Sequence, residues 1–269
     1  MKKPIALFLL TVMLTIGAGT SSASAFNIFQ IFRQLPSIIQ VIQLSNLSDQ
    51  DEIKIGTQIN KQIVNQVNIS DNEPLTQYID TLGQDLAKHG SRPDLDYTFQ
   101  VVEDDSVNAF ATMGGFVYVH TGLIEEAENE AELASVIGHE IGHITGRHAI
   151  KQMRQQGINQ IALEAIGVAD EQIVQIGVAL ALDLPHSRKD EITADTSGLN
   201  MIKAAGYAPD GMISFMKKLG SGGGPEFMST HPHSTSRVEN LENQVNNETR
   251  TQGKGLDNSS YKKQINNLM

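Results

Sequence analysis

The sequence feature that most constrains the fold is a pair of histidines inside an apolar helical segment. The chain reads HEIGH from His139 to His143, within a segment, 131–148, that has the spacing of a helix. Residues four apart share one face of a helix, so both imidazoles point the same way. The neighbouring Val136 and Ile137 are apolar, which predicts a buried helix. A fold that buries this helix must bring polar partners to the two rings.

The HExxH spacing is typical of a zinc site. Two imidazoles on one helix face can bind the same ion, and Glu140 stands beside them, where it can hold a water at the open position of the zinc. Zinc lowers the pKa of such a water toward ~7, and the glutamate takes its proton as the water attacks a carbonyl. The motif therefore predicts one Zn²⁺ per chain and a hydrolytic reaction with Glu140 as the base.

A catalytic zinc requires a third protein ligand, and two arrangements are possible. A histidine ten residues after His139 would fall on Ala149, and the adjacent His148 is turned away by about 100° on a helix. The alternative is a glutamate from a later helix, for which Glu191 has the right setting. Asp195 lies four residues on, where it can accept the second ring N–H of a ligand histidine. We interpret His148 as a supporting or structural residue, and four further histidines as ordinary polar residues: His89, His120, His186 and His233.

The rest of the pattern predicts a mainly helical α+β protein with one small antiparallel sheet. Residues 49–88 have helical spacing, whereas residues 97–102 alternate as a strand does. Two further strands, 107–111 and 116–120, form a hairpin around the glycines at 114 and 115. Later helices are predicted at 151–184, 188–205 and 211–219.

The N-terminus has the features of a signal peptide. Lys2 and Lys3 precede an apolar run over residues 5–16, and small residues lead to Ala25. The run is shorter than the ~20 residues that a membrane span needs. We therefore predict cleavage near Ala25 and a periplasmic or secreted protein.

The remaining chain is predicted to consist of an amphipathic helix over 26–47, a catalytic domain over 48–245 and a polar tail over 246–269. Within the first part, residues 26–44 either pack against protein or make peripheral contact with a membrane. Arg33 is the one cation on their polar face, which favours packing against protein. The tail is expected to contribute little to the core.

Charge and cysteine content exclude several classes of protein. Lys and Arg total 20 against 31 Asp and Glu, a formal net charge of −11, and there is no basic tract. Such a chain does not suit nucleic acid, whose phosphates attract cations. The chain has no cysteine, which excludes disulfides, thiol catalysis and thiolate zinc sites.

Six short motifs follow one another between about residues 50 and 240: NAFA (108–111), GGF (114–116), ENEAELA (128–134), HEIGH with His148, SRKDEITAD (187–195), and THP (230–232) with Arg237. In this order they resemble the zinc metallopeptidases that include the CAAX prenyl proteases, HtpX-type membrane proteases and BepA-like periplasmic proteases. The resemblance implies a zincin-like domain of the gluzincin type. It also implies that Glu140 is the catalytic base and that the zinc ligands are His139, His143 and Glu191.

The same resemblance implies that His231 approaches the metal, either as a donor to the transition state or as an inhibitory fourth ligand. Arg237 either shares this role or pairs with a carboxylate. The strand over 107–111 is interpreted as a sheet edge to which an extended peptide substrate can add as a further strand. Its substrate-binding residues are Asn108, Ala109, Phe110 and Ala111.

The activity that this resemblance implies is hydrolysis of unfolded or damaged envelope proteins by a zinc metalloendopeptidase acting in protein quality control. The alternative is a chaperone-like binding protein whose zinc site is latent because His231 blocks it. Residues 151–184, between the second and third ligands, are predicted to form a helical cover over the cleft. The oligomeric state is left open.

Overall fold

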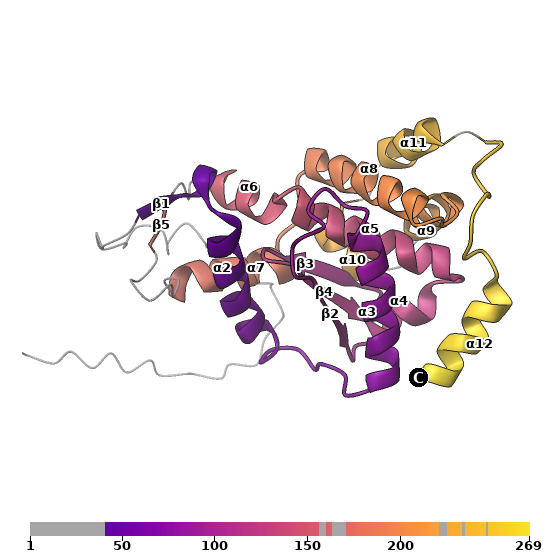
Figure 1. Cartoon of the computed structure of the whole chain (residues 1–269), viewed down its shortest axis with the longest axis horizontal. Helices are drawn as coiled ribbons and strands as arrows, with labels where there is room; N and C mark the ends of the chain where they lie inside the picture. Colours follow the sequence, from indigo (N-terminus) through magenta and orange to yellow (C-terminus); the bar gives the residue numbers. More distant parts are fainter. Residues whose placement is uncertain (1–40, 156–159, 163–170, 221–224, 233–234, 246) are drawn as a thin grey trace, which may run out of the picture. The chain divides into compact units, whose positions relative to one another are not determined.

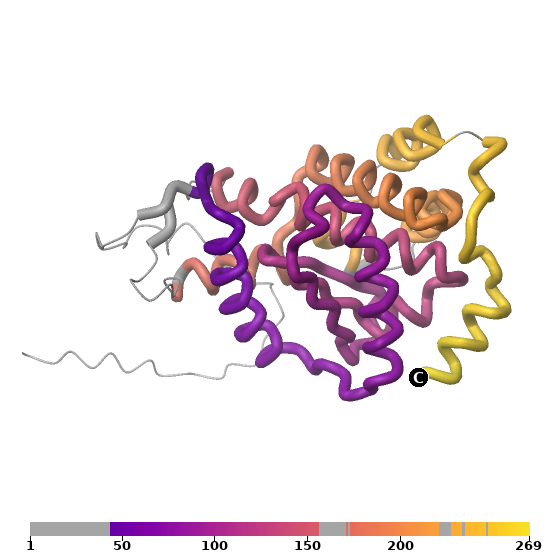
Figure 2. Tube along the Cα trace, in the orientation of Figure 1, coloured from indigo at the N-terminus to yellow at the C-terminus, as the bar shows by residue number. Residues whose placement is uncertain are grey.

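The computed structural model describes residues 41–155, 160–162, 171–220, 225–232, 235–245 and 247–269. The predicted signal peptide, most of the predicted helix over 26–47, and His233 lie outside these residues. Most of the described chain is helical (Figures 1 and 2). The helices are a 3-10 turn at Leu44–Asn46, α2 (Asp49–Ile63), α3 (Glu73–Ala87), α4 (Thr121–Glu126), α5 (Glu130–Thr145), α6 (His148–Gln155), α7 (Glu171–Leu182), α8 (Arg188–Ala204), α9 (Asp210–Gly220), α10 (Pro225–Thr230), α11 (Thr235–Gln244) and α12 (Asn258–Leu268).

The principal sheet has three strands in the order β2-β4-β3. β3 (Ala109–Thr112) and β4 (Phe116–His120) form the predicted antiparallel hairpin, whereas β2 (Thr98–Val102) runs parallel to β4. The sheet is therefore mixed and not purely antiparallel, because the chain passes from β2 to the far edge before it turns back through the centre. A second pair, β1 (Val41–Gln43) with β5 (Gln160–Ala162), was not predicted, and it replaces helix at those residues.

Helix α5 is the centre of the core, as its apolar sequence predicts. Every residue from Ala131 to Ile144 is buried, and the helix packs against α8, α9, α3 and strands β3 and β4. Its start is fixed by reciprocal hydrogen bonds: Asn129 Oδ1 accepts from Glu132 N at 3.1 Å, and Glu132 Oε2 accepts from Glu128 N at 2.9 Å. These contacts hold the HEIGH helix at a defined position within the domain.

The C-terminal residues contribute more to the core than their polar sequence predicts. In α12, Tyr261 and Ile265 are 3% and 2% exposed. The Tyr261 hydroxyl donates to Ile124 O at 2.7 Å, and Asn72 Nδ2 donates to Leu268 O at 2.6 Å. Two well-placed side chains thus dock a helix whose other residues are solvated, which an average over the segment does not reveal.

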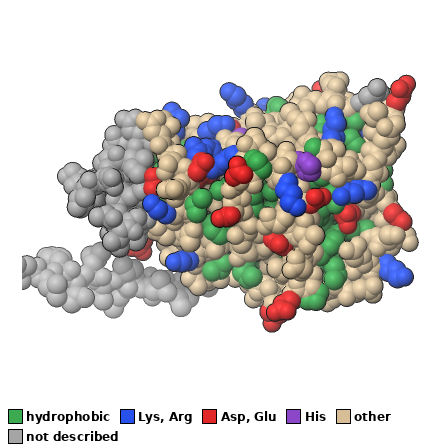
Figure 3. Space-filling view, viewed as in Figure 1, with side chains coloured by type: hydrophobic (Ala, Val, Ile, Leu, Met, Phe, Trp, Pro, Cys, Tyr) green, Lys and Arg blue, Asp and Glu red, His purple; other side chains and the backbone are tan. Residues whose placement is uncertain are grey.

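The surface of the described residues carries charges of both signs. On the face shown in Figure 3, the Lys and Arg side chains lie among Asp and Glu side chains. Within the described part of the chain, no helix combines the length and the apolar character that crossing a bilayer requires.

Candidate active site and metal centre

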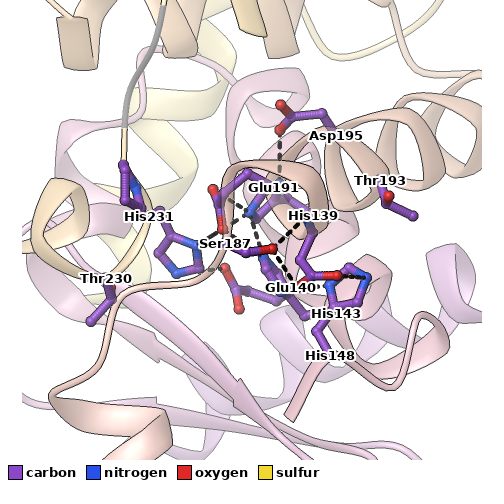
Figure 4. Close-up of polar contacts among 12 residues, drawn as sticks. His139, Glu140, His143, His148, Ser187, Glu191, Thr193, Asp195, Thr230 and His231 are labelled. Atoms are coloured by element: carbon purple, nitrogen blue, oxygen red, sulfur yellow. Dashed lines mark hydrogen bonds and ion pairs between the residues drawn. The ribbon is translucent and has the colours of Figure 1, made fainter. Parts of the chain in front are cut away.

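Four side chains from separate parts of the chain converge beside α5 (Figure 4). They are His139 and His143 of α5, Glu191 of α8, and His231, which follows α10. One possible ligand atom from each lies within 4.8 Å of the others. All four are buried, and the most exposed, His143, retains 4% of its surface. The three predicted ligands therefore come together, and His231 lies among them.

The ligand atoms face a common point. His139 Nε2 lies 2.9 Å from His143 Nε2, and Glu191 Oε1 lies 3.3 Å from His143 Nε2. His231 Nδ1 lies 3.3 Å from both His139 Nε2 and Glu191 Oε1. Two imidazoles and a carboxylate are a ligand set that zinc accepts in catalytic sites, and a third imidazole completes a possible fourth position.

Contacts on the far sides of the rings orient the two helix histidines. His139 Nδ1 lies 2.9 Å from Asp195 Oδ1, at the position predicted for Asp195. His143 Nδ1 lies 3.0 Å from His148 Nδ1. Burial lowers the pKa of His148 to about 4 and lowers that of His143 well below its usual value. Both ring nitrogens Nε2 are thereby directed at the cluster by neutral or anionic neighbours.

Arg237 pairs with both carboxylates behind the ligands. Its Nη1 lies 2.6 Å from Glu191 Oε2, and its Nε and Nη2 each donate to an Asp195 oxygen at 2.7 Å. Burial raises the pKa of Asp195, but the hydrogen bonds from Arg237 and His139 outweigh burial and lower it. Burial likewise raises the pKa of Glu191, and the charges and hydrogen bonds of the surrounding histidines outweigh it. Of its two predicted roles, Arg237 therefore has the contacts of the carboxylate partner.

Glu140 is fully buried, and neither of its carboxylate oxygens has a hydrogen-bond partner among the described residues. His231 Nε2 lies 3.5 Å from its Oε1. Burial raises the pKa of Glu140. An unpaired buried carboxylate is costly unless a donor reaches it, so this group suits a site that admits a water. Three buried carboxylates beside one guanidinium also favour a divalent cation.

Two residues of the site wall were not predicted. The ring of His186, interpreted above as an ordinary polar residue, lies 4.0 Å from that of His143. Phe227 stacks on His231 with the ring centroids 4.3 Å apart. His186 N also donates to Thr230 O at 2.9 Å, which ties this wall to the segment carrying His231. The available signal was position, because His186 immediately precedes Ser187, the N-cap of the helix that carries Glu191.

Strand β3, which begins after Asn108, lies at the edge of the described sheet. Because His120 N donates to Asn108 O, the hydrogen-bonded pairs with β4 alternate, and the main-chain groups of Ala109 and Ala111 point away from β4. The side chains of Ala109 and Phe110 are buried, the latter stacked on Tyr118 at 4.5 Å. The strand is thus fixed by its side chains and presents its backbone outward.

Two neighbouring cavities link the end of β3 to the ligands and to α7. The first is lined by Ala111 and Met113 together with His143 and His148. The second is lined by the same end of β3 together with Gly177, Leu180 and Ala181 of α7. The C-terminal end of β3 therefore adjoins the metal cluster. That the segment over 151–184 covers a cleft stays a prediction.

A close approach of α5 and α8 brings the ligands together. A Cβ atom added to Gly142 would lie 2.7 Å from Ala194 O, closer than atoms pack. We expect Gly142→Ala to separate the helices, to lower the free energy of unfolding by about 1–3 kcal/mol and to weaken zinc binding. Chemical denaturation and zinc titration measure these effects.

The matched control is Gly138→Ala, one turn earlier on α5, where the nearest atom would lie at 3.3 Å. It is expected to be neutral or stabilising, since alanine favours a helix by up to about 1 kcal/mol over glycine. Equal effects of the two substitutions would contradict the close-approach explanation.

A buried HExxH helix completed by a glutamate from a later helix defines the class of this domain as a gluzincin-type metallopeptidase. Residues 73–245 match Peptidase family M48, and the chain belongs to this family. The match runs from the start of α3 to just beyond α11 and contains all the candidate ligands.

Individual relatives agree with this assignment. Beta-barrel assembly-enhancing protease of Escherichia coli (strain K12) is 29% identical over 220 residues, which cover 75% of this chain and 45% of that protein. Mitochondrial metalloendopeptidase OMA1 of Arabidopsis thaliana is 39% identical over 147 residues, 52% of this chain and 30% of that protein. Metalloprotease YcaL of Escherichia coli (strain K12) is 30% identical over 158 residues, 55% of this chain and 61% of that protein. The chain thus spans less than half the length of the beta-barrel assembly-enhancing protease that it matches.

Proposed function

We propose that this protein is a zinc-dependent metalloendopeptidase that hydrolyses unfolded or damaged proteins of the cell envelope. The observation that carries the proposal is the convergence of His139, His143 and Glu191 beside the unpaired carboxylate of Glu140. Membership of Peptidase family M48 and the proteases among the relatives support the same activity. The predicted signal peptide ending near Ala25 supports action in the periplasm or outside the cell.

The metal would be one zinc ion, held by His139, His143 and Glu191. When bound, zinc polarises a peptide carbonyl and lowers the pKa of a water toward ~7. Glu140 accepts the proton from the attacking water and can return it to the leaving amine. Asp195 holds His139 in position, and Arg237 keeps both Asp195 and Glu191 ionised through its three contacts.

The substrate would bind along β3 as an additional strand. Ala109 and Ala111 present main-chain donors and acceptors, which pair with any extended peptide irrespective of its sequence. Asn108 precedes the strand with a buried side-chain oxygen that has no partner among the described residues, so it is suited to a donor from the peptide. An unfolded chain supplies extended backbone, whereas a folded protein does not, and this favours unfolded substrates.

The test is cleavage of casein by zinc-loaded protein. Wild type is expected to cleave it, and Glu140→Gln at the same zinc content is not. Wild-type protein that binds no zinc would refute the proposal. If wild type binds zinc but does not cleave, the position of His231 decides the next experiment.

A second candidate function is supported by His231. Its Nδ1 lies within 3.3 Å of His139 Nε2 and Glu191 Oε1, and the side chain is only 1% exposed. A histidine in this place can fill the fourth position of a zinc site and exclude water. The protein would then be a chaperone-like binding protein, or a protease held latent until His231 withdraws.

For His231→Ala we expect casein cleavage to rise about tenfold or more, because removing the competing ligand raises the fraction of molecules that are competent by that factor. Cleavage rate at matched zinc content is the measurement, with His89→Ala as the control at an exposed histidine. Lower cleavage would instead assign His231 as a transition-state donor. Silence in both proteins, with zinc bound, would favour the binding protein.

A further inference from the structure

The residue that the mechanism above leaves unused is His148, the first residue of α6. Its side chain is completely buried. One ring nitrogen, Nδ1, lies 3.0 Å from His143 Nδ1, and the other, Nε2, lies 3.5 Å from Asp190 Oδ1. Figure 4 shows its ring directly behind that of His143, on the side away from Glu191.

The turn between α5 and α6 is built to fold this ring back. Arg147 has a φ of 52°, a left-handed conformation that is uncommon for a residue with a side chain. Its guanidinium Nε lies 2.9 Å from Glu52 Oε2, which holds it in place. A Cβ atom on Gly146 would lie 2.3 Å from His148 Nε2, so only glycine leaves room for the imidazole there.

The two facing Nδ1 atoms determine where the protons lie. One must donate and the other must accept. If His143 presents the lone pair of Nε2 to a metal, its proton is on Nδ1, so His143 donates and His148 accepts. The proton of His148 is then on Nε2, which faces Asp190. Asp190 is itself held by Ser187, whose Oγ lies 2.6 Å from Asp190 Oδ2.

We propose that His148 is a positioning residue of the metal centre, which accepts the Nδ1–H of His143, is anchored by Asp190, and keeps His143 Nε2 directed at zinc. The inference rests on the proposed zinc site but not on peptidase activity. It distinguishes the two helix ligands, because His139 has a carboxylate behind it, whereas His143 has an imidazole with its carboxylate one ring further away.

Zinc affinity, measured by competition with a chelator, tests this role. His148→Leu removes the acceptor and is expected to weaken zinc binding 10- to 100-fold, the usual effect of losing a partner of a ligand histidine. His148→Asn retains an acceptor oxygen near the place of Nδ1 and is expected to stay within about threefold of wild type. Gly146→Ala, which displaces the ring, is expected to resemble His148→Leu.

The matched control is His120→Leu. His120 is also buried, and its Nδ1 lies 2.8 Å from Ser106 Oγ, but it is not among the metal-binding residues. This substitution is expected to lower the melting temperature of the metal-free protein and to leave zinc affinity unchanged. A merely structural His148 would behave in the same way as His120, and that result would overturn the inference.

Nitrogen NMR of zinc-loaded wild type provides a test that needs no variant. We expect His143 to carry its proton on Nδ1 and His148 on Nε2. A proton on Nδ1 of His148 would overturn the inference while leaving the zinc site intact. Failure of wild type to bind zinc would overturn both the inference and the proposed function, so the two failures are distinguishable.

Discussion

Replacement of Glu140 by Gln is expected to lower the rate of casein cleavage by about 10²- to 10⁴-fold, the range that a general base contributes. The amide cannot accept the proton of the attacking water, yet it has nearly the same size and shape as the carboxylate. Glu140 is fully buried and makes no hydrogen bond within the described residues, so few native contacts are lost. Cleavage is measured as kcat/KM at equal zinc content.

Zinc binding should persist in Glu140→Gln, since Glu140 is outside the set of His139, His143 and Glu191 proposed to hold the ion. The control is Glu128→Gln, which makes the same chemical change at an exposed carboxylate before α5 and is expected to leave the rate unchanged. Undiminished cleavage by Glu140→Gln would remove Glu140 as the base, whatever the metal content.

Replacement of Arg237 by Met is expected to lower the free energy of unfolding of the zinc-free protein by about 3–5 kcal/mol. The side chain is 1% exposed and pairs with Glu191 and Asp195, so its removal leaves two buried carboxylates without their cation. Methionine fills much of the volume, which confines the effect to charge and hydrogen bonding. The measurement is urea denaturation of apo-protein.

Zinc should reduce the deficit of Arg237→Met, because a cation bound to Glu191 replaces part of the lost charge. The control is Arg250→Met, which removes a guanidinium that pairs with Asp210 and Glu242 while 26% exposed. Such partly solvated pairs contribute about 0–1 kcal/mol. Equal losses for the two arginines would show that the buried pairing is not what stabilises the site.

The local elements were predictable because their causes are local. Helical spacing predicted α5 and α8, and alternation with a glycine turn predicted the β3–β4 hairpin. The parallel pairing of β2 with β4 was not predicted, because periodicity reports which faces are buried and not which strands are neighbours. The docking of α12 likewise depends on two side chains that meet a distant surface.

Within the candidate site, the sequence by itself determined what lies within one helical turn. The four-residue spacing of His139 and His143 places both rings on one face, and that of Glu191 and Asp195 does the same on α8. The family motifs added the expectation that these two faces belong to one site.

Only the tertiary structure decided what meets these faces. It showed that Arg237 pairs with both carboxylates, that His231 lies among the ligands, and that His148 contacts His143 from behind. Each of these contacts depends on how closely α5 and α8 pack or on how the chain turns after α5. Such distances arise from the packing of the whole core, and no spacing along the sequence encodes them.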